Sequence, residues 1–367
     1  MAKGTQIGGY TILGEIGAGG WGIVYKAMSA DNRIVALKEF YPQSIAHRSR
    51  HGLQANSTGV HVAYESALKK FREEGNLLAK VNHRSIVKVY EYFEQDQTGF
   101  LAMAFVEGNV PGEPAPNLNT VALTGQSMPP ADVKRLADEL MNALEVLHAR
   151  QIVHRDIAPD NILMAGLRND EPMIIDLGGA RSVAAFLSST MEALVKPGFT
   201  PIEQYAANYA QQKPPEASAD IYATSAVLYR VITGTNPVEA VLRAVGHDLD
   251  PPLDPGRFEA FDPKFLFAVS KGLSLDARER PQTIAQWRTL MSEGGSAGGD
   301  SGPGKRKPWP LAVKFALIAL ACLVIGLIIG TKFALIAFVC LVIGLIIGTK
   351  FALMALACLI IGLIIGS

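Results

Sequence analysis

The chain has 367 residues, which is enough for one large domain or two smaller ones, and its formal net charge is zero. All 34 acidic residues lie before residue 301, whereas three of the 34 basic residues lie in a strongly apolar C-terminal stretch. The rest of the chain is therefore slightly acidic, which excludes the broad basic surface of a nucleic-acid-binding protein. A disulfide framework or cysteine metal site before the apolar stretch is also excluded, because the only cysteines are Cys322, Cys340 and Cys358.

The N-terminal part of the chain predicts a small β-rich region with one helix. Residues 10–40 indicate short strands interrupted by glycines, and Ile34–Lys38 is a compact apolar strand signal. Residues 41–64 are polar and irregular, which indicates an insertion, and residues 65–80 have helical spacing. Two further strands are expected at Ile86–Phe93 and Phe100–Val106.

After these strands the pattern changes to that of helices. Residues 107–130 are rich in Pro, Gly and Asn and predict a loop. Residues 131–150 form a strong amphipathic helix pattern, with Asp132 in the first turn, where the helix dipole favours an anion. Further helices are expected near 219–233, 263–273 and 281–292. The sequence thus predicts an α+β chain in which a small β-rich lobe precedes a larger helical lobe.

A glycine-rich pattern, G-x-G-x-x-G-x-V, lies near the N-terminus. Its matching positions are Gly17, Ala18, Gly19, Gly22 and Val24. Glycines let a backbone approach phosphates and present N–H donors to them. Alone, the pattern is a weak signal and favours an ordinary glycine-rich hairpin. A dinucleotide-binding motif would need a helix directly after the glycines, whereas Ile23–Tyr25 continue as a strand.

Lys38 ends the apolar strand signal, and a buried lysine is costly unless it is paired. One interpretation is an edge lysine whose ammonium reaches water. The other is a lysine that holds the α- and β-phosphates of ATP. The second interpretation requires a carboxylate partner, for which the following helix offers Glu74, or Glu73 one position round.

The most specific signal is the stretch His154-Arg155-Asp156-Ile-Ala158-Pro-Asp-Asn161, followed fifteen residues later by Asp176 in Ile-Ile-Asp-Leu-Gly. With the glycine loop, Lys38 in VALK, and Pro201-Ile202-Glu203 in the place of A-P-E, five motifs occur in order. Over residues 10–292 the chain resembles the protein kinase superfamily, specifically the bacterial eukaryotic-like Ser/Thr kinases. The resemblance implies a bilobal α+β protein-kinase fold. It would have a lead over residues 1–9, an N-lobe over about 10–106 and a C-lobe over about 107–292.

The resemblance also implies ATP-dependent transfer to Ser or Thr of protein substrates, with Mg²⁺ or Mn²⁺ as the metal. Asp156 would accept or orient the proton of the substrate hydroxyl, and Asn161 and Asp176 would supply the hard oxygen ligands that Mg²⁺ prefers. Adenine would lie between Ala36, the gatekeeper Met103 and the hinge. The hinge residues would be Ala104, Phe105 and Val106, although plain strand packing would explain these positions equally well.

Three further residues have supporting roles by the same resemblance. Glu203 and Arg280 would form a buried ion pair that braces the C-lobe, and Asp220 would accept hydrogen bonds from the catalytic-loop backbone. Arg155 would receive a phosphate from the activation loop. The candidate acceptors are Ser188, Ser189 and Thr190, which otherwise form a Ser/Thr-rich loop with no switch role.

Two departures from the family pattern bear on activity. Ala158 stands where most Ser/Thr kinases have a lysine near the γ-phosphate, and Asp160 stands where tyrosine kinases compensate with an arginine. Lys196 stands where Ser/Thr kinases have a threonine beside the catalytic Asp. One hypothesis is an exchange, in which the Lys196 ammonium lies within ion-pair reach of Asp156 and replaces the missing lysine. Otherwise Lys196 points to solvent or substrate and activity is low, or the chain is a pseudokinase used as a nucleotide-sensing scaffold.

A linker and an apolar tail follow the kinase-like region. Residues 293–309 are rich in Gly, Ser and basic residues, which is typical of a flexible linker. Residues 310–367 contain an 18-residue apolar repeat that begins at Lys314, Lys332 and Lys350. As a helix each repeat is about 27 Å long, close to the thickness of a hydrocarbon core, so transmembrane helices are expected. One helix through all three repeats would be too long for a single crossing, so the number of crossings stays open.

The flanks of the tail indicate its orientation and its partners. Lys305–Lys307 and Trp309 form a basic flank with an interfacial aromatic, and the N-terminus has no signal-peptide core. We therefore expect a bacterial cell-membrane protein with a cytoplasmic kinase domain. A channel function of the tail is disfavoured, because the tail has no acidic residue and no polar stripe. A GxxxG in each repeat either packs helices into a homo-oligomer in lipid or was copied by duplication: Gly326/Gly330, Gly344/Gly348 and Gly362/Gly366.

Overall fold

The computed structural model describes residues 1–49, 52–121, 128–166, 168, 170–176, 195–205, 216–244 and 253–293. The chain divides into two units, and the first, residues 1–237 and 251–296, holds every strand and site residue discussed below. Of the second unit, residues 238–250 and 297–367, the short helix α7 (Ala240–Ala244) is described. The apolar repeats and the activation-loop residues Ser188, Ser189 and Thr190 lie outside the described residues. Within the described ranges, every helix is too short or too polar to cross a membrane.

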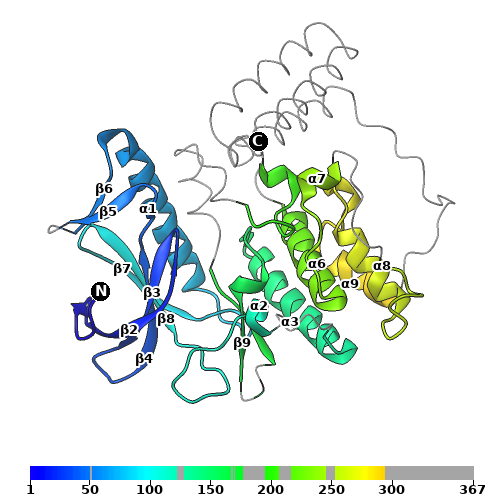
Figure 1. Ribbon diagram of the computed structural model, residues 1–367, viewed down its shortest axis with the longest axis horizontal. Helices are drawn as coiled ribbons and strands as arrows, with labels where there is room; N and C mark the ends of the chain where they lie inside the picture. The colour runs from blue at the N-terminus through cyan, green and yellow to red at the C-terminus, as the bar shows by residue number, and fades with distance from the viewer. Residues whose placement is uncertain are drawn as a thin grey trace, which may run out of the picture. The chain divides into compact units, whose positions relative to one another are not determined.

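The N-lobe is built on one antiparallel sheet of six strands (Figure 1). In spatial order the strands are β1 (Gln6–Ile7), β2 (Tyr10–Gly19), β3 (Gly22–Met28), β4 (Ile34–Phe40), β8 (Thr98–Ala104) and β7 (Val89–Gln95). The sequence predicted short strands interrupted by glycines, and this was wrong for β2, which runs through Gly14 and Gly17. These glycines lie at irregularities in the β2–β3 pairing, so they bend the strand without ending it.

The two faces of the sheet serve different purposes. Tyr25, Leu37 and Phe100 are fully buried in an apolar cluster on one face. Because successive side chains in a strand point to opposite faces, Val24, Ala36 and Lys38 belong to the other face. The alternation thus separates the core of the lobe from the side chains expected to meet the nucleotide.

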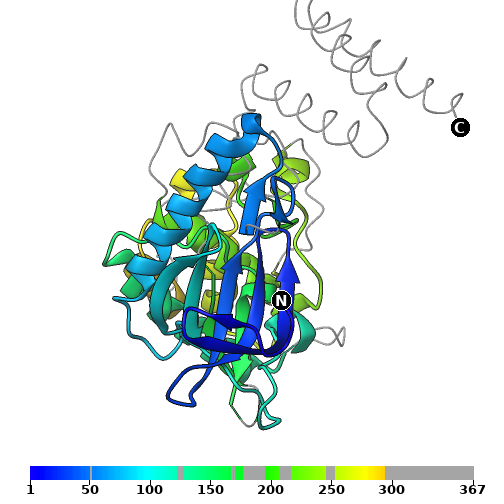
Figure 2. The same ribbon diagram turned by 90° about the vertical axis from the view of Figure 1, so that its left-hand side faces the viewer.

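Residues 41–64, expected to be irregular, contain regular structure. A hairpin of β5 (Ala46–Ser49) and β6 (Gly52–Ala55) leads directly into α1 (Thr58–Leu78), which is a full turn or more longer than expected. Figure 2 shows α1 running beside the sheet, where it packs on β7, β8 and β6. The sequence missed the helix start because the apolar Val62 is 71% exposed next to the buried Ala63 and Tyr64, which blurs the amphipathic pattern of the first turns.

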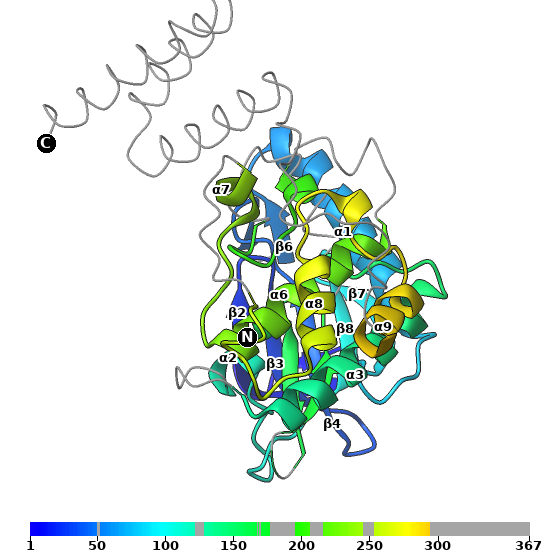
Figure 3. The same cartoon turned by 90° about the vertical axis from the view of Figure 1, so that its right-hand side faces the viewer.

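The C-lobe is a group of helices at the predicted positions (Figure 3). They are α3 (Pro130–His148), α6 (Ala217–Thr233), α8 (Pro263–Gly272) and α9 (Ile284–Glu293). Nearly every side chain of α6 is buried, so α6 is the central helix of the lobe. Smaller elements were not predicted: α2 (Leu118–Val121) within the expected loop, the 3-10 turn η1 (Pro159–Asn161), and the hairpin of β9 (Ile162–Ala165) and β10 (Glu171–Ile174).

Candidate active site

The loop between α3 and β9 carries the HRD motif, and its backbone is hydrogen-bonded to the Asp220 carboxylate of α6. Asp220 Oδ2 accepts from the backbone N–H of His154, and Oδ1 accepts from the N–H of Arg155, each at 2.8 Å. His148 Nε2 lies 2.8 Å from the same Oδ2. Arg155 adopts a positive φ of 66°, a strained conformation that these bonds stabilise. Asp220 therefore has the geometry that the sequence predicted for it.

Two buried ionisable groups, Asp220 and His154, have pKa values shifted by their surroundings, and these shifts set their protonation states near pH 7. Burial alone would raise the pKa of Asp220, but the hydrogen bonds from the His148 side chain and from the His154 backbone hold that pKa below its usual range. Burial lowers the pKa of His154, so its imidazole is neutral near pH 7. Its Nε2 donates to the carbonyl of Ile175 at 3.1 Å, and its Nδ1 accepts from Asp156 N at 3.3 Å. His154 thus ties the backbone of Asp156 to the strand end that leads to Asp176.

Asp156, Asn161 and Lys196 meet at the surface of the catalytic loop. Asn161 Nδ2 donates to the backbone carbonyl of Asp156 at 2.8 Å and to its Oδ2 at 2.6 Å. Lys196 Nζ lies 3.3 Å from Asp156 Oδ2 and 2.9 Å from Asp160 Oδ1. The predicted proximity of Lys196 to Asp156 is therefore present, and Asp160 is a second carboxylate that the sequence had not assigned to it.

Lys38 is paired, but with a different carboxylate from the one expected. The sequence suggested Glu74 or Glu73, whereas Lys38 Nζ lies 2.6 Å from Asp176 Oδ1. Glu73 instead pairs with Lys70, its neighbour on α1, at 2.6 Å. A positive φ of 58° at Asp176 turns this residue out of an ordinary strand path, an effect that helical spacing on α1 could not reveal.

The donor set near Asp156 fits a hard divalent cation. Asp176 supplies a carboxylate, and Asn161 uses its amide N–H groups on Asp156, which leaves the amide oxygen as its ligand atom. Mg²⁺ is commonly bound by one or two such oxygens together with substrate phosphates. A cluster of three or more His, Cys, Asp or Glu is absent from the described part of the chain. Asn161 and Asp176 are therefore the residues here that would hold the metal.

The glycine loop has room for a ligand. Gly17 and Gly19 pair with Val24 and Gly22 across the β2–β3 turn. A Cβ placed on Gly17 or Gly19 would meet no protein atom within 4 Å, and neither residue has a positive φ. The fold itself does not require glycine there, and the open space beside both residues would let a phosphate approach the backbone closely. Gly22 differs, because a Cβ there would lie 2.6 Å from the carbonyl oxygen of Glu39.

The expected adenine-binding residues lie side by side. Ala36 and Met103 are directly paired between β4 and β8, and each is only 7% exposed. In the hinge, Ala104 N donates to Lys88 O, and Val106 O accepts from Ala115 N, both at 2.8 Å. The Val106 N–H has no acceptor among the described residues, so it is a backbone donor suited to a purine.

Phe105, between these two hinge residues, is covered by Lys26 of β3. The Lys26 ammonium lies 4.8 Å from the centroid of the Phe105 ring and donates to the carbonyl of Gly112. Gly112 adopts a positive φ of 80°, which glycine tolerates without strain. The strand that carries Val24 is thus tied to the segment after the hinge.

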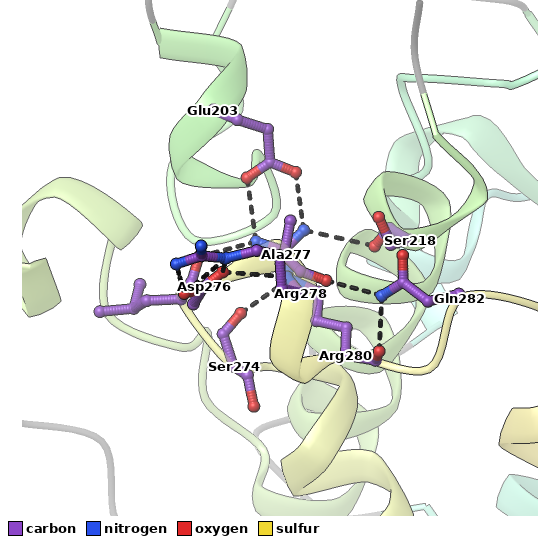
Figure 4. A network of polar contacts seen from close by, with 9 residues as sticks. Glu203, Ser218, Ser274, Asp276, Ala277, Arg278, Arg280 and Gln282 are labelled. Carbon is purple, nitrogen blue, oxygen red and sulfur yellow. Dashed lines mark hydrogen bonds and ion pairs between the residues drawn. The ribbon is translucent and has the colours of Figure 1, made fainter. Parts of the chain in front are cut away.

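The C-lobe brace is found as predicted (Figure 4). Arg280 follows the turn η4 (Ala277–Glu279), and its two terminal nitrogens lie 2.7 and 2.9 Å from the carboxylate oxygens of Glu203, in the turn η3 (Ile202–Tyr205). The guanidinium is fully buried and stacks 4.8 Å above the Tyr222 ring. Its remaining donors reach backbone carbonyls of Ser274, Leu275 and Ser218.

A second buried carboxylate, Glu39, was missed by the sequence reasoning. Glu39 follows Lys38 on β4 and is fully buried. Arg48 of the β5–β6 hairpin donates to both its oxygens at 2.8 and 2.7 Å, and the Tyr25 hydroxyl donates at 3.0 Å. Burial, and then Glu39, raise the pKa of Tyr25. The signal was available, because Glu39 shares the inward alternation of Val35 and Leu37.

Known proteins resemble the chain over this same region. The PpkA-294 apo form is 31% identical with a TM-score of 0.69, covering 79% of this chain and 99% of that one. The PknI kinase domain of Mycobacterium tuberculosis, at 19% identity and a TM-score of 0.56, shares the fold. Serine/threonine-protein kinase pkn2 of Myxococcus xanthus is 26% identical over 309 residues, and serine/threonine-protein kinase B of Synechocystis is 26% identical over 293.

These curated relatives are longer than the matched region. The alignments cover 82% and 76% of this chain but only 34% and 45% of the two relatives. The chain therefore spans less than half the length of the curated relatives it matches. The family model of the protein kinase domain matches residues 10–281, so the chain belongs to the protein kinase family.

Proposed function

We propose that the chain is an ATP-dependent protein kinase that transfers the γ-phosphoryl group of ATP to Ser or Thr of proteins, itself included. The observation that carries this proposal is the assembly of Lys38, Asp156, Asn161 and Asp176 from three separate segments: Lys38 pairs with Asp176, Asn161 bonds to Asp156, and the N–H of Ile175, next to Asp176, donates to the Asn161 carbonyl at 3.0 Å. The Ser/Thr preference is supported by the names of the relatives.

Each residue has a role in the transfer. Lys38 and the glycine loop bind the phosphates, and Asn161 and Asp176 hold the metal, whose charge offsets that of the phosphates. The substrate hydroxyl oxygen forms a bond to the γ-phosphorus while the bond from that phosphorus to the β,γ-bridging oxygen breaks. The bond electrons leave with ADP, and the hydroxyl proton passes to the Asp156 carboxylate. The hydrogen bond from Asn161 Nδ2 to Asp156 Oδ2 fixes the orientation of the Asp156 carboxylate for this step.

Lys196 completes the charge stabilisation in this proposal. Ala158 is only 1% exposed and has no cation to offer, whereas the Lys196 ammonium already lies beside the catalytic carboxylate. Phosphoryl transfer spreads negative charge over the equatorial oxygens, and a cation within contact distance lowers the barrier. Lys196 therefore takes the part of the lysine that most Ser/Thr kinases carry at the Ala158 position.

The apolar tail anchors this kinase to the membrane in our proposal. Its support is the length and composition of the three repeats and the basic flank at Lys305–Lys307. The kinase domain then lies on the cytoplasmic side. Recovery of the full-length chain in the soluble fraction without detergent would contradict the anchor and leave the kinase activity untouched.

The transfer is tested with the full-length chain, Mg-ATP carrying a labelled γ-phosphate, and a protein substrate. We expect labelled phosphoserine or phosphothreonine, and its loss in Asp156→Asn and Lys38→Met. Asp138→Asn is the control, since Asp138 forms an exposed pair with Lys134. Full labelling in either site variant would refute the assignment. Nucleotide binding without any transfer by the unmodified chain would identify a nucleotide-sensing scaffold in its place.

A further inference from the structure

One ammonium is shared between two carboxylates at the catalytic loop. Lys196 Nζ is closer to Asp160, at 2.9 Å, than to Asp156, at 3.3 Å. The two carboxylates differ in exposure, because the Asp156 side chain is 9% exposed and that of Asp160 is 50% exposed. Asp156 is therefore the buried partner of the ammonium, and Asp160 is its solvent-exposed partner.

The main chains on both sides of this contact are fixed. Lys196 N donates to Thr200 Oγ1 at 2.9 Å, and the Lys196 carbonyl accepts from the N–H groups of Phe199 and Thr200 at 3.0 and 3.1 Å. Asp160 lies in η1, where the next residue, Asn161, donates to the carbonyl of Ala158 at 2.9 Å. Movement at this contact is therefore confined to the side chains, above all to the long side chain of Lys196.

Because the Lys196 side chain can move, its ammonium could lose its position during the reaction, and a second carboxylate would prevent this. A γ-phosphoryl group brought beside Asp156 adds negative charge that competes with Asp156 for the same ammonium. A lysine stem has four rotatable carbons and loses its position easily when one partner is withdrawn. A carboxylate that takes no part in bond making can hold the ammonium while its other contact changes.

We propose that Asp160 is a positioning residue that anchors Lys196 while the ammonium turns from Asp156 to the γ-phosphoryl group; this rests on the proposed function of Lys196. Asp160 touches neither the substrate hydroxyl nor the phosphate in this role. It acts through Lys196 alone, so removal of Lys196 makes Asp160 dispensable. The competing role for a half-exposed acid at this place is recognition of a basic substrate side chain.

The kinetic test uses the full-length chain and Asp160→Asn, Asp160→Glu, Lys196→Ala and the double variant Asp160→Asn/Lys196→Ala. We expect Asp160→Asn to lower kcat about tenfold with little change in the KM of a protein substrate, and Asp160→Glu to restore part of it. The double variant should be no slower than Lys196→Ala alone, because residues that act as a unit are not additive. Additive losses, or a raised KM with unchanged kcat, would overturn the proposal.

A second readout does not depend on turnover. With Mg²⁺ and a β,γ-imido analogue of ATP bound, the rate of acetylation of Lys196 is compared by mass spectrometry with that of Lys134 in the same molecule. Lys134 pairs with Asp138 at 2.9 Å and serves as the internal reference. Asp160→Asn should raise the Lys196 rate severalfold and leave the Lys134 rate unchanged. An unchanged Lys196 rate would overturn the proposal, whatever the outcome of the activity assay for the proposed function.

Discussion

Two of the cation–carboxylate sites in the C-lobe, at Arg280 and at Lys196, are built in opposite ways. The Arg280 guanidinium is fully buried, meets Glu203 with two nitrogens, and satisfies its other donors on backbone carbonyls. The Lys196 ammonium is partly exposed and divides itself between Asp156 and Asp160. A guanidinium whose donors are all hydrogen-bonded is held in one position, whereas an ammonium shared by two carboxylates can exchange one partner for another. The Arg280 arrangement suits a purely structural ion pair, and the Lys196 arrangement suits a cation that changes partners during phosphoryl transfer.

Arg280→Ala should produce the largest change and affect stability alone. The variant leaves Glu203 without its partner in a largely buried site, which typically costs about 3–5 kcal/mol. Urea unfolding of the domain should show this loss, while kcat per folded molecule stays near that of the parent. Arg278→Ala is the matched control two residues away, because the Arg278 side chain is 89% exposed. Equal losses of unfolding free energy in Arg280→Ala and Arg278→Ala would contradict a special structural role for the buried Arg280–Glu203 pair.

Lys196→Ala should show the reverse pattern. Loss of a cation that acts mainly in the transition state should lower kcat by about 10²-fold. ATP affinity should change little. The free energy of unfolding should change by less than about 1 kcal/mol, because Asp156 keeps its hydrogen bond from Asn161 and the Asp160 side chain is 50% exposed. Stopped assays at saturating ATP, together with urea unfolding, measure both quantities. Normal turnover in this variant would eliminate Lys196 as the replacement for the missing lysine.

A rescue variant sharpens the same distinction. Adding Ala158→Lys to Lys196→Ala should recover about tenfold of the lost kcat, since it returns an ammonium to the catalytic loop. Full recovery is not expected, because Ala158 is 1% exposed and a longer side chain must displace its neighbours. Ala158→Leu in the same background carries similar bulk without the charge and should recover nothing. Equal recovery by leucine would show that the effect is one of packing.

The smallest expected effect is on the pH dependence of the free energy of unfolding, through His154 in the catalytic loop. His154 has a pKa held below its ordinary value of about 6.5, so the unfolded chain binds a proton there before the folded chain does. The free energy of unfolding should therefore be full above pH 6.5 and fall by about 1 kcal/mol toward pH 5.5. Part of that slope belongs to His83, whose pKa is lowered by burial and by Arg84. His154→Phe should flatten the slope, and an unchanged slope would contradict the role of His154.

The sequence predicted most of what local patterns can encode. The amphipathic period located α3 within a residue or two, and the motif order brought Asp156, Asn161 and Asp176 to one lobe. Helical spacing suggested Glu74 or Glu73 beside Lys38, whereas the structure pairs Lys38 with Asp176, whose positive φ is a backbone turn that no residue spacing records. The β5–β6 hairpin was missed because few of its side chains are buried, so its strands lack a clear alternation.

That hairpin constrains how the N-lobe can change during evolution or redesign. A chimera with a short loop in place of residues 41–57 would remove Arg48 and leave the Glu39 carboxylate on β4 without its cation. An uncompensated charge would then lie next to the phosphate-binding lysine, and the strand that presents Lys38 would be the first to lose its order. The β5–β6 hairpin and Glu39 are thus expected to be kept or lost together. Lineages that lose the hairpin are expected to carry an apolar residue at the position of Glu39, and loop grafts succeed only when both are exchanged together.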